Sequence, residues 1–225
     1  MEGKDIILDG PVAVGKTTLM REFSRRLGEK LFVFPEFIDE HKFLSTDEEV
    51  ERSKKILDKR FSGEEKPIVL QMYILERWKQ FAERAKGIAD GKIRIYERLP
   101  DDSVFVFGKN CVEPDEYVTL QEKLKEVDEL LPSYLTMDGL DVLWIDFRND
   151  FDPKKVEEVV DKAISSDKKY VFINITSDDN FSNYKSRGRK EELYTRESIS
   201  QLNDSYADFI VEIYGKIRPV EYVRL

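Results

Sequence analysis

Residues 10–17 form a glycine-bounded loop of the G-x-x-x-x-G-K-[ST] type, and no other feature limits the fold of this chain so strongly. The loop follows an apolar run at 6–8 and precedes a helix-like segment, which is the strand–loop–helix setting that the motif requires. Glycines let backbone N–H groups close around phosphate oxygens at the start of a helix. The predicted nucleotide site comprises Gly10, Pro11, Val12, Ala13, Val14, Gly15, Lys16, Thr17 and Thr18. Within it, we expect Lys16 to reach the β- and γ-phosphates and the Thr17 hydroxyl to bind Mg²⁺.

Composition limits what surrounds this loop. A chain of 225 residues suits a single α/β domain over 1–225. The formal net charge of −9 argues against nucleic acid as a partner, because an acidic surface repels a phosphate backbone. Cys111 and His41 are the single cysteine and histidine, which excludes a disulfide framework and a His/Cys zinc cluster. The sequence has no apolar run of membrane length and no signal-peptide pattern, so we expect a cytoplasmic protein without membrane contact.

Apolar runs alternate with longer helix-like stretches, a pattern typical of a parallel sheet flanked by crossover helices. The runs predict strands at 5–8, 31–34, 92–96, 141–147, 170–175 and 220–225. Periodicity and capping residues predict helices at 18–27, 67–88, 116–131, 154–165 and 196–214. The fold class is therefore α/β, a central parallel sheet with flanking helices and a basic lid segment. The unit at 141–165 reads as a rearranged or inserted strand and helix, so the strand order is left open.

Polar residues follow several of the predicted strands. Glu36 comes after the second strand, Glu97 and Arg98 after the third, and the basic segment 185–190 after the strand that ends near 175. In open parallel sheets ligands bind beyond the carboxyl ends of the strands, so we expect these groups to converge with the phosphate loop on one cleft.

Each of these groups fits a part in phosphoryl transfer. Glu36 has apolar neighbours, which are expected to raise its pKa and suit it to act as a base; the alternative is an exposed loop acid. Glu97 could bind Mg²⁺ beside Thr17, and Arg98 could contact a phosphate or the attacking oxygen; the alternative for this adjacent pair is a strand-end salt bridge. The segment with Arg187, Arg189 and Lys190 could close as a lid on ATP, or be a solvated charge run.

Several motifs together resemble the cellular and viral deoxyribonucleoside kinases. They are the phosphate loop, the Pro35-Glu36-Phe37 turn, Leu70-Gln71-Met72-Tyr73, Glu97-Arg98, and Arg187-Gly188-Arg189-Lys190-Glu191-Glu192, in that order along the chain. The resemblance implies a P-loop kinase that transfers the γ-phosphate of ATP, with Mg²⁺, to the 5′-hydroxyl of a deoxyribonucleoside. We also expect a homodimer.

The same resemblance implies roles for single residues. Glu36 would be the base, Arg98 would steady the reacting 5′-oxygen, and Glu97 with Thr17 would bind Mg²⁺. Gln71 would pair with the nucleobase, Glu192 would accept from the sugar 3′-hydroxyl, and Arg187 and Arg189 would close over ATP. Ile74 and Trp78 follow Gln71 on one helix face and so are expected to line the base pocket. The bulk of Trp78 there would favour a pyrimidine, although a lone helical tryptophan is more often part of the core.

The sequence also departs from the family pattern. Lys59-Arg60-Phe61 stands where a tyrosine that shares the 3′-hydroxyl is usual, so Glu192 would carry that recognition alone. The segment Leu99-Pro100-Asp101-Asp102-Ser103 replaces a serine-rich continuation, and Asn183 replaces an arginine at the start of the lid, where Lys185 is a possible substitute.

Three other functions stay open. A nucleoside monophosphate kinase, such as a thymidylate kinase, would need a further anion site near Arg98, which Arg94 or Lys42 could supply. A P-loop ATPase or nucleotide-dependent switch would use Asp146, at the end of an apolar strand, as its Mg²⁺ partner. The third is a protein that binds nucleotide without turnover.

Overall fold

A six-stranded parallel sheet forms the centre of the computed structural model, which describes residues 3–109, 111–137, 140–147, 152–177, 180–187, 194–214 and 220–224. The strand order is β2-β3-β1-β5-β4-β6, and each neighbouring pair runs parallel. The strands are β1 (Asp5–Asp9), β2 (Leu31–Phe34), β3 (Ile93–Glu97), β4 (Asp141–Phe147), β5 (Tyr170–Ser177) and β6 (Val220–Arg224). The predicted α/β class and all six predicted strands are therefore confirmed, with small differences at the strand ends.

The described helices include the five that the sequence predicts. They are α1 (Lys16–Leu27), α3 (Pro67–Ala85), α5 (Pro114–Asp128), α6 (Pro153–Ser165) and α8 (Arg196–Tyr214). A short 3₁₀ helix, η1 (Gly28–Lys30), follows α1. Three further helices were not predicted: α2 (Asp47–Ser62), α4 (Pro100–Phe105) and α7 (Asn180–Arg187).

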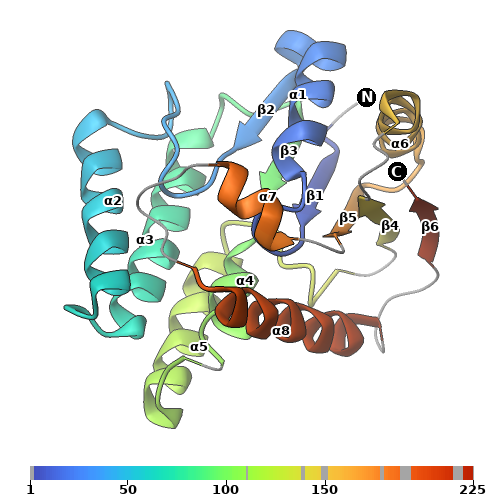
Figure 1. The fold of residues 1–225 in the computed structure, drawn as a ribbon. Helices are drawn as coiled ribbons and strands as arrows, with labels where there is room; N and C mark the ends of the chain where they lie inside the picture. Colours follow the sequence, from blue (N-terminus) through green and yellow to red (C-terminus); the bar gives the residue numbers. More distant parts are fainter. Residues whose placement is uncertain are drawn as a thin grey trace.

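Helices cover both faces of the sheet because successive strand residues point to opposite faces. Ile6 and Leu8 of β1 pack with α1 and α6 in one buried cluster, to which Phe23 and Val159 belong. Ile7, between them in the sequence, belongs to the cluster on the other face, together with residues of α3, α4, α5 and α8. Figure 1 shows α1 and α6 above the sheet, and α4, α5 and α8 below it.

This two-sided arrangement creates a crevice at the carboxyl ends of β1 and β3. The chain leaves β1 into α1 on one face, and leaves the adjacent β3 into α4 and α5 on the other. Adjacent strands whose connections diverge in this way form the usual ligand crevice of open α/β sheets. The phosphate loop and the Glu97-Arg98 pair both lie at this point.

The strand order explains the unit at 141–165 that the sequence left open. β5 is later in the chain than β4, yet β5 is the strand that pairs with β1, and β4 lies one position further out. The strand and helix at 141–165 thus extend the sheet on its outer side, and β5 carries the chain back to the centre.

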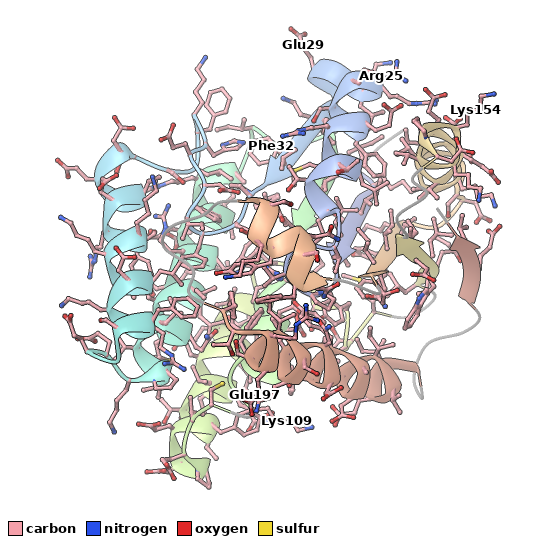
Figure 2. All side chains as sticks on the ribbon, viewed as in Figure 1. Arg25, Glu29, Phe32, Lys109, Lys154 and Glu197 are labelled. Carbon is pink, nitrogen blue, oxygen red and sulfur yellow. The ribbon has the colours of Figure 1, made fainter. Side chains whose placement is uncertain are left out.

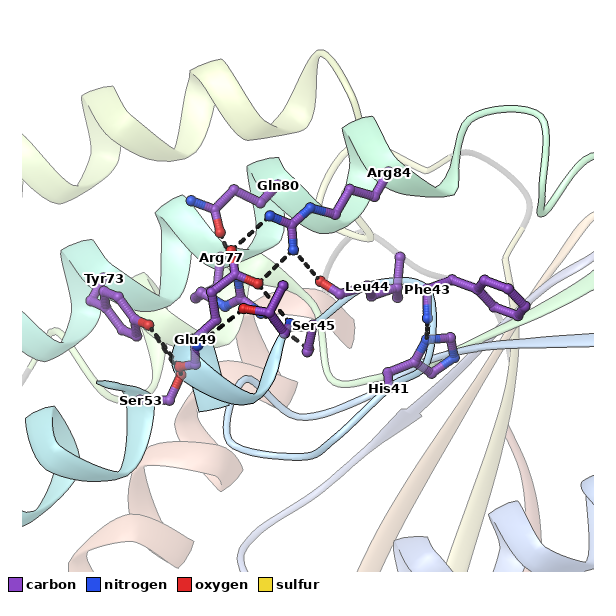
Figure 3. Close-up of polar contacts among 11 residues, drawn as sticks. His41, Phe43, Leu44, Ser45, Glu49, Ser53, Tyr73, Arg77, Gln80 and Arg84 are labelled. Carbon is purple, nitrogen blue, oxygen red and sulfur yellow. Dashed lines mark hydrogen bonds and ion pairs between the residues drawn. The ribbon is translucent and has the colours of Figure 1, made fainter. Parts of the chain in front are cut away.

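Polar contacts fasten α2 to α3 (Figure 3). Glu49 caps the start of α2 with Thr46, and its carboxylate accepts two hydrogen bonds from Arg84 of α3, at 2.6 and 2.7 Å. Arg77, which is 1% exposed, adds an ion pair to Glu49 at 3.1 Å, and the Ser53 and Tyr73 hydroxyls lie 3.1 Å apart. Because α2 has few buried apolar residues, these contacts hold it as one wall of the crevice described below.

The surface carries many charged side chains, of which the labelled Arg25, Glu29 and Lys154 project outward (Figure 2). Within the described part of the chain, no helix has both the length and the apolar character needed to cross a membrane.

Candidate active site

The loop after β1 has the backbone shape of a phosphate-binding loop. Gly10 has φ +133°, and a Cβ atom there would lie 2.2 Å from the Ile175 carbonyl oxygen, so only glycine fits. Gly15 has φ +103° and starts α1, and the Gly10 N–H donates to the Asp9 carboxylate at 2.7 Å. The loop leads directly into the N-terminus of α1, and the N–H groups at a helix N-terminus are suited to binding phosphate oxygens.

Lys16 is folded back onto the loop. Its ammonium is buried and donates to the carbonyl oxygens of Gly10 at 3.0 Å and Pro11 at 2.8 Å. Burial, followed by the charge of Arg98, lowers the pKa of Lys16 to about 8. A cation held among dipoles in a buried site interacts strongly with an incoming phosphate.

Glu36 and Arg98 form a buried ion pair across the crevice. The Arg98 Nη1 atom donates to Glu36 Oε1 at 2.6 Å, and the exposed fractions of the two side chains are 8% for Glu36 and 14% for Arg98. The sequence predicted that these strand-end residues converge, and they do. The alternative of an exposed loop acid at Glu36 is wrong. The apolar neighbours of Glu36 in the sequence gave no indication of this contact with Arg98.

Glu97 lies on the α1 side of the sheet, since it continues the alternation of Ile93 and Ile95, which pack on that face. It pairs in register with Leu8 on β1, next to the loop. Burial and the neighbouring Glu36 charge raise the pKa of Glu97 to about 7. Thr17 is exposed in the first turn of α1.

A pocket with about 670 Å³ of empty space, partly continuous with solvent, joins these groups. It is lined by Val12, Glu36, Phe37, Ile38, Leu57, Leu70, Gln71, Ile74, Trp78, Glu97, Arg98, Leu99, Asp102, Ser103, Phe107 and Tyr194. Six sequence-predicted residues are therefore brought together here with Val12 of the loop: Glu36, Gln71, Ile74, Trp78, Glu97 and Arg98.

Gln71 is the clearest polar contact point at the α3 side of the pocket. It is 5% exposed, and its Oε1 atom has no hydrogen-bond partner among the described residues. A buried amide without a partner is costly, so a ligand that pairs with it would remove that cost. Trp78 lines the same pocket and also packs against Phe34 and Phe81, with ring centroids 6.2 and 5.8 Å away. Both interpretations of Trp78, core and pocket wall, are correct.

Asp102 lines the pocket as well, but its oxygens already have partners. The Tyr134 hydroxyl donates to one at 2.7 Å and the Leu99 N–H to the other at 3.3 Å. Burial and the Asp9 charge raise the pKa of Asp102. Its role is to cap α4 and support the floor of the pocket.

A family model for deoxynucleoside kinases matches residues 6–142, more than half of the chain. The chain belongs to the deoxynucleoside kinase family. A search of curated protein sequences gave no significant match. Among solved structures, a deoxyadenosine kinase from M. mycoides with bound dATP is similar, at 20% identity and a TM-score of 0.54, over 98% of this chain and 90% of that one. The same kinase with the products dCMP and a flexible dCDP bound has 22% identity and a TM-score of 0.55, over 97% and 89%. These structures share its fold.

In this deoxynucleoside kinase, the contacts of the residues that were predicted for the alternative functions lie elsewhere than at Arg98. Arg94 pairs with Asp5 in the first half of β3, and Lys42 lies over the Phe43 ring, so neither contacts Arg98. Asp146 is the last residue but one of β4, two strands and therefore about 10 Å from β1, whereas Glu97 is on the strand next to β1. The predictions of an extra anion site at Arg94 and of an ATPase metal ligand at Asp146 are not supported by this geometry.

The lid predictions fall largely outside the described residues. Arg187 ends α7, and Arg189, Lys190 and Glu192 are beyond it in the part of the chain that is not described. Tyr194, the first described residue after this stretch, does reach the crevice. The Tyr194 N–H donates to the Tyr184 hydroxyl of α7 at 3.0 Å, and the Tyr194 ring lines the pocket.

Two tyrosines in the site were missed by sequence reasoning. Tyr206 of α8 accepts a hydrogen bond from Arg98 Nε at 2.9 Å, and Tyr194 packs edge-to-face on Phe61 with ring centroids 5.0 Å apart. Phe61 belongs to the stretch that replaces the usual tyrosine of the family. Neither tyrosine stands at a strand end or in a motif, so no local signal marks it; the helical period of α8 shows only that Tyr206 is on its buried face.

Proposed function

We propose that this deoxynucleoside kinase transfers the γ-phosphate of ATP to the 5′-hydroxyl of a deoxyribonucleoside and releases a 5′-monophosphate. The observation that carries the proposal is the buried Glu36–Arg98 pair. It lines a pocket beside the phosphate loop, in which the amide oxygen of Gln71 has no hydrogen-bond partner among the described residues. A base and a cation at one end and a polar recognition group at the other match an acceptor that has a hydroxyl and a nucleobase.

Glu36 would take the proton of the 5′-hydroxyl. The 5′-oxygen would then bond to the γ-phosphorus as the bond to the β–γ bridging oxygen breaks and ADP leaves. Arg98 donates to Oε1 of this carboxylate, and a carboxylate has about four lone-pair directions in which it can accept. Lys16 and Arg98 would balance the charge on the transferring group, with Arg187 and Arg189 added when the lid closes.

Thr17 and Glu97 are the residues that would hold Mg²⁺. They fit this ion because a magnesium that bridges nucleotide phosphates needs only one or two protein ligands besides water. Among the described residues, no group of three or more His, Cys, Asp or Glu side chains is placed to hold a metal ion. When bound, Mg²⁺ neutralises charge on the β- and γ-phosphates. Glu97 must be ionised to bind it.

Recognition of the nucleoside would use the α3 side of the pocket. Gln71 would pair with the edge of the base, while Ile74 and Trp78 contact its faces. The preference for a pyrimidine, inferred from the bulk of Trp78, stays a prediction. Glu192 would accept from the sugar 3′-hydroxyl.

The test is a turnover assay with ATP and Mg²⁺ on thymidine, deoxycytidine, deoxyadenosine and deoxyguanosine, and on their 5′-monophosphates. We expect at least one free nucleoside to give its 5′-monophosphate, identified by mass spectrometry, and Lys16→Ala to abolish the product. Turnover of monophosphates without turnover of any nucleoside would replace this proposal with a monophosphate kinase. Nucleotide binding without any turnover would indicate a binding protein.

A further inference from the structure

Arg98 is held in an unusual backbone conformation at the end of β3. Its φ is +69°, and among the described residues the other non-glycine residue with positive φ is Ala13 in the phosphate loop. Its N–H donates to the Leu8 carbonyl at 2.9 Å, which extends the pairing with β1 by one bond. Left-handed backbone at a non-glycine residue costs free energy, and it persists where the surroundings hold it in place. The direction in which the Arg98 side chain leaves the strand is thus fixed.

Three segments then hold the guanidinium. Nη1 donates to Glu36, Nε donates to the Tyr206 hydroxyl at 2.9 Å, and the group lies over the Phe107 ring, 5.3 Å from its centroid. Nη2 is buried and has no hydrogen-bond partner among the described residues. A planar guanidinium with two of its nitrogens bonded has a fixed rotation, so the third nitrogen is presented in one direction.

Tyr206 comes from the other end of the chain, 108 residues from Arg98. It is 1% exposed on α8 and packs edge-to-face on Phe107, with ring centroids 6.0 Å apart. Its hydroxyl is a neutral acceptor. A carboxylate at this place would add a second negative charge to the one that Glu36 already brings to the guanidinium, whereas a hydroxyl orients the group without adding charge.

We propose that Tyr206 is a positioning residue for catalysis: its hydroxyl fixes the rotation of the Arg98 guanidinium so that Nη2 is available to the reacting oxygen while Nη1 stays on Glu36. This inference rests on the proposed function for its effect on turnover. Its structural part, that the hydroxyl orders Arg98, stands independently.

The test compares Tyr206→Phe with Tyr96→Phe. Tyr96 is a matched control because it is also 1% exposed and its hydroxyl also bonds to a charged group, Asp5 Oδ1, at 3.0 Å. Asp5 begins β1, so this bond lies at the opposite end of the sheet from the pocket. We expect Tyr206→Phe to lower kcat by about tenfold, the worth of one hydrogen bond to a charged group, with the KM for ATP unchanged within about twofold. Tyr96→Phe should leave kcat unchanged within about twofold.

A double-variant cycle separates positioning from general loss of packing. In an Arg98→Lys background there is no Nε to orient, so adding Tyr206→Phe should cause no further fall in kcat. A second tenfold fall in that background, or equal kcat for Tyr206→Phe and Tyr96→Phe, would overturn the proposal.

A readout that needs no substrate is the Nε–H signal of Arg98 in ¹⁵N-arginine-labelled protein, identified by its loss in Arg98→Lys. Tyr206→Phe should shift this signal and speed its exchange with solvent, and Tyr96→Phe should not. An unchanged signal would overturn the ordering role whatever the activity. A changed signal in an enzyme that phosphorylates no nucleoside would support the ordering role and refute the proposed function.

Discussion

Arg98 and Glu36 are 62 residues apart in the sequence, and their side chains meet at 2.6 Å. They meet because β2 and β3 are adjacent and parallel, so the residues that follow these strands emerge at the same edge of the sheet. The pair lies next to β1 and its phosphate loop, since β3 also pairs with β1. Sheet topology alone therefore brings a carboxylate, a guanidinium and the Lys16 ammonium into one buried site.

Glu36→Gln tests the role of the carboxylate in this pair. Glutamine keeps an oxygen that can accept from Arg98 but is a very weak base, so we expect kcat to fall by roughly 10²- to 10⁴-fold. Binding of ATP and of the nucleoside, measured by calorimetry, should change little. Asp39→Asn is the comparison variant, because Asp39 is close enough to contribute to the raised pKa of Glu97. Full activity of Glu36→Gln with loss in Asp39→Asn would move the base to Asp39.

How much of this site the sequence predicts depends on the range of the interactions. Glu36, Glu97 and Arg98 were predicted to converge because each directly follows a buried strand, which is local information combined with one rule about parallel sheets. Tyr206 was not predicted to lie in the site, because its contact with Arg98 depends on how α8 packs across the sheet. The order of β4 and β5 could not be predicted for the same reason: it is decided by long-range packing.

The missed helix α2 shows a second limit. Its residues include few that become buried, namely Val50, Ser53 and Leu57, so apolar periodicity is weak. What stabilises α2 is the capping box at Thr46 and the bonds from Arg84 and Arg77 to Glu49, and these arginines belong to α3. Helix α4 has only six residues and starts at Pro100. A helix this short is too brief for a repeating pattern of apolar residues to reveal it in the sequence.

The Glu49 contacts predict a pH dependence of stability. Hydrogen bonds from Arg84 lower the pKa of Glu49 to about 2, from its ordinary value of 4.5. A lowered pKa in the folded state means that the carboxylate stabilises the fold at pH values above its unfolded pKa, and that this contribution is lost as the pH falls through 4.5 toward about 2. Wild type should therefore exceed Glu49→Gln in unfolding free energy by about 2 kcal/mol at pH 6, with a smaller difference at pH 3.

Urea unfolding at the two pH values measures this difference. Glu51→Gln is the control, because Glu51 is on the same helix, is 64% exposed and lies 3.8 Å from its partner Lys54. Exposed pairs of this kind contribute little. An equal effect of pH on the two variants would show that the Glu49 contacts do not stabilise α2.

Gly10→Ala tests the close approach of the phosphate loop to β5. The added Cβ would meet the Ile175 carbonyl oxygen at 2.2 Å. Ile175 is held in β5, and Gly10 directly follows β1, so neither backbone can move away easily. We expect a loss of several kcal/mol in stability together with loss of ATP binding. Gly63→Ala provides the control: Gly63 has φ +79°, and a Cβ there meets nothing within 4 Å, so it reports the backbone cost alone, about 1 kcal/mol. Similar losses in the two variants, measured by thermal unfolding, would contradict the contact.

The last prediction concerns recognition of the sugar. Glu192→Ala should raise the KM for a deoxynucleoside and have a smaller effect on its 2′,3′-dideoxy analogue, because the analogue has no 3′-hydroxyl to donate to the carboxylate. Phe61 lies in the stretch where the family usually has a tyrosine, so Glu192 is predicted to bind the 3′-hydroxyl alone. The structure adds Tyr194, whose ring packs on Phe61 and lines the pocket.

Tyr194→Phe, measured on the same two substrates, decides between one recognition group and two. Removing a hydroxyl that bonds to the 3′-hydroxyl should raise KM for the deoxynucleoside by about tenfold and leave the dideoxy analogue unaffected. Equal KM values for wild type and Tyr194→Phe on both substrates would leave Glu192 as the single contact. Equal losses on the deoxy and dideoxy substrates in Glu192→Ala would mean that its carboxylate does not touch the sugar. In that case the match of residues 187–192 to the family motif would have to be redrawn.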